Sequence, residues 1–164
     1  IPDMADWSPP GYAGLTWGRL GWLKDLTGLP LIIKGVRTVG DAIQAAEFGA
    51  DAVVVSNHGG RQLDGTRSSI ETLPEIASAV GDRLEVFLDS GIRRGLDVLK
   101  AIALGARAVL MGRPLFWGLA VNGEAGVRTA LDILRVEFDR AMAYCGRTRI
   151  ADIDRSLVTL PSEL

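Results

Sequence analysis

The chain has 164 residues, a formal net charge of −2 and 48% apolar residues, which is typical of a globular domain with enough chain for one core. The near-neutral charge excludes the basic surplus of a nucleic-acid binder, and the sequence has no apolar run of about 18 residues that would span a membrane. One cysteine, Cys145, excludes an internal disulfide and a thiol metal cluster, so no metal site is expected. We expect Cys145 to pack on an apolar helical face. The first residues lack the basic and apolar regions of a signal peptide, so we expect a cytoplasmic protein.

Strands and helices are predicted to alternate along the chain. Short apolar runs predict strands at 31–36, 52–56, 85–89 and 107–112. Helical spacing of apolar residues predicts helices at 38–48, 69–80 and 93–104, and a long last helix through 127–142. Continuous apolar runs are typical of parallel strands that helices bury on both faces. This α/β pattern leaves two architectures, an open doubly wound sheet or a (β/α)₈ barrel.

Polar residues at the ends of the predicted strands favour the barrel. Lys34, Ser56, Asp89 and the pair Gly112 and Arg113 all lie at or just after a strand's carboxyl end, where a barrel collects its ligand-binding groups. Burying an unpaired ammonium costs several kcal/mol, so Lys34 should face a ligand or an acidic partner. The alternative is that its stem lies along the barrel rim and its charge reaches water.

The only histidine lies directly after the second predicted strand, three residues before an arginine, in the run Ser56-Asn57-His58-Gly59-Gly60-Arg61. Histidine is suited to proton transfer near neutral pH, and the planar fork of an arginine matches a carboxylate. The motif therefore places a proton acceptor and a carboxylate-binding group together, at His58 and Arg61. The plainer alternative is an ordinary loop in which both side chains satisfy local hydrogen bonds.

Two later turns have the features of a phosphate-binding site. In Asp89-Ser90-Gly91-Ile92-Arg93-Arg94-Gly95 and Leu110-Met111-Gly112-Arg113-Pro114, glycines free the backbone where a helix begins. The loops after the last two strands of a (β/α)₈ barrel commonly hold a phosphate group, which would make this chain the second half of a barrel. We expect Arg93 to face inward and Arg94 to face solvent. The alternative is that the glycines only terminate helices.

Four motifs stand in the order and spacing of one family. They are Leu31-Ile32-Ile33-Lys34-Gly35, the histidine motif that begins at Ser56, and the two glycine turns that begin at Asp89 and Leu110. The chain resembles the FMN-dependent enzymes that oxidise 2-hydroxy acids, a family that includes glycolate, lactate and mandelate oxidases and dehydrogenases. The likeness extends from about Leu15 to Leu160. It implies oxidation of a small L-2-hydroxy acid to the 2-oxo acid with FMN as cofactor.

The resemblance also implies roles for individual residues. Lys34 would lie near the flavin N1 and C2 carbonyl, Ser56 would hydrogen-bond the cofactor, His58 would be the base, and Arg61 would bind the substrate carboxylate. A fixed cation such as Lys34 would stabilise the charge of reduced flavin. The remaining cofactor-binding residues would line the ribityl and phosphate region; they are Asp89, Gly91, Arg93, Gly112 and Arg113.

The resemblance covers only part of such a barrel. Residues 1–14 resemble the end of the mobile active-site loop that precedes the fifth strand, and residues 15–164 resemble the C-terminal half, strands five to eight, of a single FMN-binding domain. We therefore expect a piece of a longer protein whose partners are the N-terminal half of the same barrel and, by resemblance, further copies in a homotetramer.

Two other functions compete with this hypothesis. An FMN-dependent prenyl diphosphate isomerase, or another phosphate-binding barrel enzyme, would use the two glycine turns equally well. It would give no role to His58 together with Arg61. A binding domain without catalysis would leave Lys34, His58 and Arg61 without a joint purpose.

Overall fold

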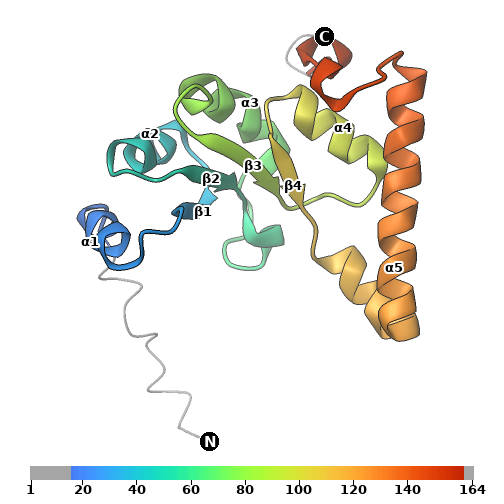
Figure 1. Cartoon of the computed structure of the whole chain (residues 1–164), viewed down its shortest axis with the longest axis horizontal. Coiled ribbons are helices and arrows are strands. Elements are labelled where there is room, and N and C mark those ends of the chain that lie inside the picture. The colour runs from blue at the N-terminus through green and yellow to red at the C-terminus, as the bar shows by residue number, and fades with distance from the viewer. Residues whose placement is uncertain (1–15, 161–164) are drawn as a thin grey trace, which may run out of the picture.

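A computed structural model describes residues 16–160 of the chain. Four strands form one parallel sheet in chain order, β1 (Ile32–Val36), β2 (Ala52–Val55), β3 (Glu85–Asp89) and β4 (Ala108–Leu110) (Figure 1). The segment 1–14, predicted as the end of an active-site loop, lies outside the described residues.

A helix follows each strand. The α-helices are α1 (Gly18–Thr27), α2 (Val39–Glu47), α3 (Ser69–Val80), α4 (Gly95–Ala103) and α5 (Arg113–Tyr144), and the 3₁₀ turns are His58–Gly60, Ile150–Asp152 and Arg155–Leu157. The predicted third helix begins at Gly95 instead of Arg93, because the Asp97 carboxylate accepts hydrogen bonds from the backbone N–H groups of Arg93 and Arg94 and keeps both residues ahead of the helix. The predicted fourth strand ends earlier, at Leu110, where its pairing with Asp89 ends.

The two faces of the sheet have different surroundings. One face packs into the main apolar core beneath the helices, through Ile33, Val53, Val55, Val86, Leu88 and Val109. Figure 1 shows α2, α3 and α4 together on one side of the strands. On the opposite face, Ile32 of β1 is 49% exposed and Leu110 of β4 is 40% exposed. The prediction that the strands are buried on both faces is therefore wrong for β1 and β4, because the described helices cover one face only.

This arrangement decides between the two predicted architectures. A doubly wound sheet reverses its strand order and carries helices on both faces, whereas a (β/α)₈ barrel keeps its strands in chain order with the helices outside. The sheet has the order β1-β2-β3-β4 with one face covered. The α/β half-barrel prediction is confirmed, and the numbering of its strands as five to eight stays a prediction.

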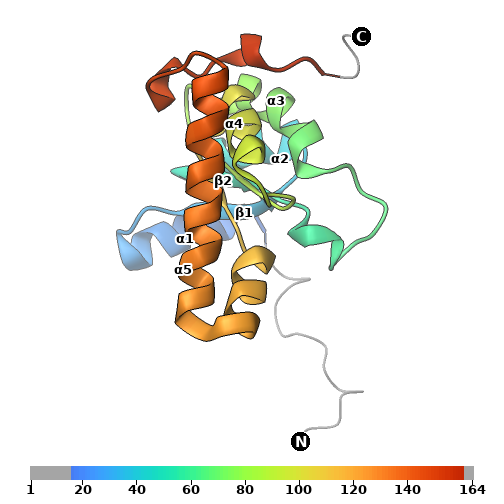
Figure 2. The ribbon, with the colours of Figure 1, turned by 90° about the vertical axis from the view of Figure 1, so that its right-hand side faces the viewer.

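Helix α5 is a hairpin of two helical arms, 113–121 and 124–144 (Figure 2). The chain reverses at Asn122 and Gly123, whose backbone angles are not helical. At Gly118 and Gly126 the backbones of the two arms are in direct contact, because a Cβ added to Gly126 would lie 1.9 Å from the carbonyl oxygen of Gly118. Between residues 16 and 160, no helix combines the length and apolar character that crossing a membrane requires.

The end of α5 closes a second apolar cluster. Its buried members include Leu99 of α4, Met142 of α5 and Ile153 after the helix. Cys145 is half-buried and packs against this cluster, in agreement with the expected packing role.

The hairpin contact makes a prediction for stability. In the full-length protein, Gly126→Ala should destabilise the fold by about 2 kcal/mol or more, because the new methyl group overlaps the Gly118 carbonyl and forces the arms apart. The matched control is Gly21→Ala in α1, where an added Cβ meets nothing within 4 Å and helix propensity improves. Urea unfolding measures both changes, and equal stabilities for the two variants would contradict the close crossing.

Candidate active site

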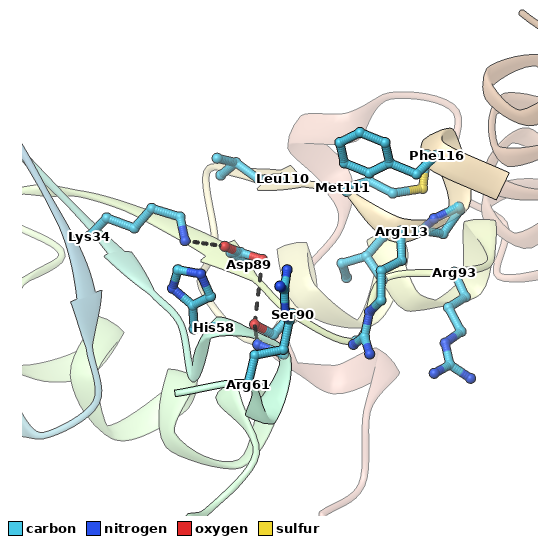
Figure 3. A pocket seen from close by; sticks show the side chains of 15 residues that line it. Lys34, His58, Arg61, Asp89, Ser90, Arg93, Leu110, Met111, Arg113 and Phe116 are labelled. Carbon is cyan, nitrogen blue, oxygen red and sulfur yellow. Dashed lines mark hydrogen bonds and ion pairs between the residues drawn. The ribbon is translucent and has the colours of Figure 1, made fainter. Parts of the chain in front are cut away.

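The loops after β2, β3 and β4 surround a depression at the carboxyl edge of the sheet, with a cavity volume of about 180 Å³ (Figure 3). The predicted site residues that line it are Lys34, His58, Arg61, Asp89, Gly91, Arg93, Gly112 and Arg113. The remaining predicted residue, Ser56, is 2% exposed and forms hydrogen bonds with Lys34 and Asp89 of this lining. The structure thus brings together side chains that are far apart in the sequence.

Ser56 joins the ends of three strands through its hydroxyl group. Its Oγ donates to Asp89 Oδ2 at 3.1 Å and accepts from Lys34 Nζ at 3.3 Å. The same oxygen accepts from the backbone N–H of His58 at 3.1 Å. Hydrogen bonds are stronger in the low dielectric of the protein interior than in water. The buried hydroxyl group of Ser56 therefore fixes the positions of Lys34, Asp89 and the loop that carries His58.

Lys34 has an acidic partner, which is one of the two surroundings that the sequence predicts. Its Nζ lies 2.5 Å from Asp89 Oδ2, and the side chains of Lys34 and Asp89 are 42% and 22% exposed. Burial raises the pKa of Asp89, but the hydrogen bond and charge of Lys34, with help from Ser56 and the Ser90 backbone, lower it further. The net result is an Asp89 pKa below its usual value.

The loop after β2 presents His58 in an unusual backbone conformation. His58 has φ 58°, and the following Gly59 and Gly60 also have positive φ, which glycine adopts without steric cost. Positive φ is uncommon for other residues and is concentrated at functional sites. Asn57 holds the turn, because its side chain accepts from the Gly59 N–H and its own N–H donates to Ser69 Oγ on α3. The exposed imidazole of His58 therefore stands at the rim of the depression on a fixed loop.

Ser90 is a site residue to which sequence reasoning gave no role. It has φ 80°, and its Oγ accepts from the Gly59 N–H at 2.9 Å and lies 3.5 Å from Ser56 Oγ. Ser90 therefore ties the loop after β3 to the loop after β2. The signal available in the sequence is its place between Asp89 and Gly91 in the predicted phosphate turn, which does not specify a partner.

One end of the depression is suited to an anion. Arg93 and Arg113 extend in the same direction there, separated from Lys34 by Asp89 and Ser90 (Figure 3). An added Cβ on Gly91 or Gly112 would meet nothing within 4 Å, so both backbones lie open to a ligand.

The lining of the whole depression is strongly cationic and partly apolar. Its charged side chains are four cations, Lys34, Arg61, Arg93 and Arg113, and one carboxylate, Asp89. Arg94 is outside this set, as predicted, and pairs with Glu137. Leu110, Met111 and Phe116 add an apolar wall that the sequence reasoning missed. Such a lining suits a ligand with an anionic end and a flat apolar part, and it lies at the carboxyl edge of the strands, where enzymes of the barrel class bind cofactors.

Comparison with known proteins identifies the family. The family model described as FMN-dependent dehydrogenase matches residues 7–160, so the chain belongs to this family. The resemblance stated from the motifs is therefore confirmed.

Relatives with different names are similarly close. The chain is 54% identical over 146 residues to an L-lactate oxidase of Nostoc sp., and 52% identical over 144 residues to 2-hydroxyacid oxidase 1 of Mus musculus. It is also 52% identical over 147 residues to a pre-mycofactocin synthase of Mycobacterium tuberculosis. These matches cover 89%, 88% and 90% of the chain and 40%, 39% and 37% of the relatives, so the chain spans about two fifths of their length.

Solved structures agree in fold and sequence. A flavocytochrome b2 variant with sulfite bound superposes with a TM-score of 0.87 at 46% identity, covering 92% of this chain and 40% of that chain. A mandelate oxidase variant with a monooxide FMN adduct superposes with a TM-score of 0.82 at 48% identity, covering 86% and 45%.

The lowered pKa of Asp89 makes a prediction for pH dependence. The pKa of Asp89 is lower in the folded state than in the unfolded state, where it has the usual value of 3.8. The pairing with Lys34 therefore stabilises the fold fully at pH values above 3.8, and this stabilisation is lost as the pH falls through the folded-state pKa. In the full-length protein, the difference in unfolding free energy between wild type and Asp89→Asn should therefore be constant near neutral pH and shrink in the acid range. Asp82→Asn, an exposed change away from the site, should show no such trend. A constant Asp89 difference down to pH 2.5, roughly a unit below an ordinary Asp pKa, would contradict the pairing.

Proposed function

We propose that the full-length protein binds FMN and oxidises a small L-2-hydroxy acid of the glycolate, lactate or mandelate type to the 2-oxo acid. The observation that carries this proposal is the joint placement of His58, Arg61 and Lys34 at one end of a depression whose other end is an open anion site. Membership of the FMN-dependent dehydrogenase family supports it.

The residues of the depression fit FMN. Arg93 and Arg113, with the open backbone at Gly91 and Gly112, would hold the phosphate. Asp89 would accept hydrogen bonds from ribityl hydroxyl groups. The cavity volume of about 180 Å³ is small beside the roughly 300–1,000 Å³ of complete ligand sites, which supports a site of which this chain forms one wall.

Oxidation of a 2-hydroxy acid removes two electrons and two protons, and FMN, when bound, supplies the electron acceptor. An imidazole nitrogen of His58 accepts one of the protons from the substrate. Arg61 binds the substrate carboxylate through two parallel N–H···O bonds and so orients the substrate carbon. Lys34, held by Asp89 and Ser56, places a fixed positive charge where negative charge develops.

The missing walls belong to the N-terminal half of the same barrel in this proposal. The uncovered sheet face, with Ile32 and Leu110 exposed, is the surface that those strands would close. A homotetramer, which rests on the resemblance alone, and a cytoplasmic location complete the proposal.

The first test is colour. Full-length protein should be purified yellow, and anaerobic glycolate, lactate or mandelate should bleach it. A yellow protein that none of these acids reduces would instead favour a reaction like that of the relative named pre-mycofactocin synthase, to which the chain is 52% identical. A protein without flavin would contradict the proposal altogether.

The role of His58 predicts a selective loss of rate. His58→Asn should keep FMN bound but slow flavin reduction by about 100-fold or more, because a general base is lost. Stopped-flow absorbance measures the reduction rate, and Gln62→Asn, in the same loop but outside the depression, is the control. Reduction at the wild-type rate would exclude His58 as the base.

The role of Arg61 predicts a change in preference between acid and ester. Arg61→Lys retains the charge but loses the bidentate geometry, so kcat/KM for the acid should fall by about 10-fold to 100-fold, the value of a charged hydrogen bond. The methyl ester of the same substrate should lose less. Arg67→Lys is the matched control, since Arg67 pairs with Glu75 outside the depression. An unchanged ratio of acid to ester activity would refute carboxylate binding by Arg61.

A further inference from the structure

Helix α5 contacts the predicted phosphate loop at Arg93. The guanidinium carbon of Arg93 lies 5.9 Å from the centre of the Trp117 ring, over its face. This distance is within the range of a cation–π interaction. Trp117 is 53% exposed and is absent from the lining of the depression, so the ring acts on the site only through Arg93.

A second contact from α5 fixes the backbone beside Arg93. Glu137 accepts from Arg94 Nη2 at 2.7 Å, from Arg94 Nε at 3.0 Å and from the Gly95 N–H at 3.0 Å. Helix α4 also begins in direct contact with α5, because a Cβ added to Gly95 would lie 2.0 Å from the Phe138 nitrogen. The main chain that follows Arg93 therefore has little freedom, and the remaining freedom lies in the Arg93 side chain.

Arg93 needs a constraint of this kind. Among residues 16–160, no carboxylate lies within ion-pair distance of Arg93. A free arginine side chain loses up to about 2 kcal/mol of rotamer entropy when a ligand fixes it. An aromatic ring against the guanidinium face reduces that loss and leaves all N–H donors, which lie in the guanidinium plane, free at its edges.

We propose that Trp117 is a positioning residue for the cofactor phosphate: it holds the guanidinium of Arg93 by its face, so that the N–H edge stays directed into the depression. This inference rests on the proposed binding of FMN. The hairpin of α5 provides the rigidity, because Trp117 precedes Gly118, where the short arm contacts the long arm. Arg113 begins the same arm, so one helical hairpin places both arginines of the anion end.

The experiment compares FMN with riboflavin, which lacks the phosphate. Full-length protein freed of flavin is titrated with each, and quenching of flavin fluorescence gives the two dissociation constants. Trp117→Leu should weaken FMN binding by about 5-fold, the value of a moderate cation–π contact, and leave riboflavin binding within about 2-fold of wild type. Trp117→Phe keeps an aromatic face and should restore most of the FMN affinity. Trp22→Leu, a change of another exposed tryptophan, on α1, should alter neither constant.

A double-mutant cycle tests whether Trp117 acts through Arg93. In an Arg93→Ala background, Trp117→Leu should cause no further loss of FMN affinity. The inference would be overturned if Trp117→Leu weakened riboflavin binding as much as FMN binding, or if it still weakened FMN binding in the Arg93→Ala background. Either result would show that Trp117 has a merely structural role. If Arg93→Ala abolishes the preference for FMN but Trp117→Leu does not, the inference alone fails. Wild-type protein without a preference for FMN over riboflavin would overturn the proposed function as well.

Discussion

The hydroxyl group of Ser56 is the interaction on which the geometry of the site depends. It lies at the end of the buried strand β2 and bonds Lys34 from β1, Asp89 from β3 and the backbone of His58. Ser56 is 2% exposed, so its hydroxyl group makes these hydrogen bonds away from water, where they are stronger than at the surface. These bonds hold the ends of the three strands in their relative positions and so preorganise the site.

Much of the fold follows from local sequence signals. The buried run 52–56 predicts β2 to within one residue, and the predicted helix 69–80 has the bounds of α3, since apolar burial and helical spacing are local signals. The apolar run at β1 does not by itself reveal the uncovered sheet face, because it reads the same whether one face or both are covered; that face follows only from the half-barrel prediction. The start of α4 depends on Asp97, whose carboxylate competes for the N–H groups that precede the helix.

The site was predictable in its members but not in its connections. His58, Arg61 and the glycine turns stand out in the sequence because packing alone gives no reason for these residue types at the junction between a strand and a helix. The hydrogen bond from Gly59 to Ser90 and the cation–π contact of Arg93 with Trp117 join segments distant in sequence. A serine or a tryptophan at such positions has many possible partners, so only the fold selects one.

In the proposed function, the distribution of charge would let one depression serve two anions. At the end near His58, Asp89 offsets the charge of Lys34 at 2.5 Å, which would leave Arg61 as the cation available to a substrate carboxylate. At the other end, Arg93 and Arg113 have no carboxylate within ion-pair distance among residues 16–160, because Glu137 pairs with Arg94 and Asp97 is occupied by backbone N–H groups. In that proposal, a dianionic phosphate is attracted most strongly to the end that Arg93 and Arg113 line. This asymmetry would keep the substrate's carboxylate and the phosphate from exchanging places.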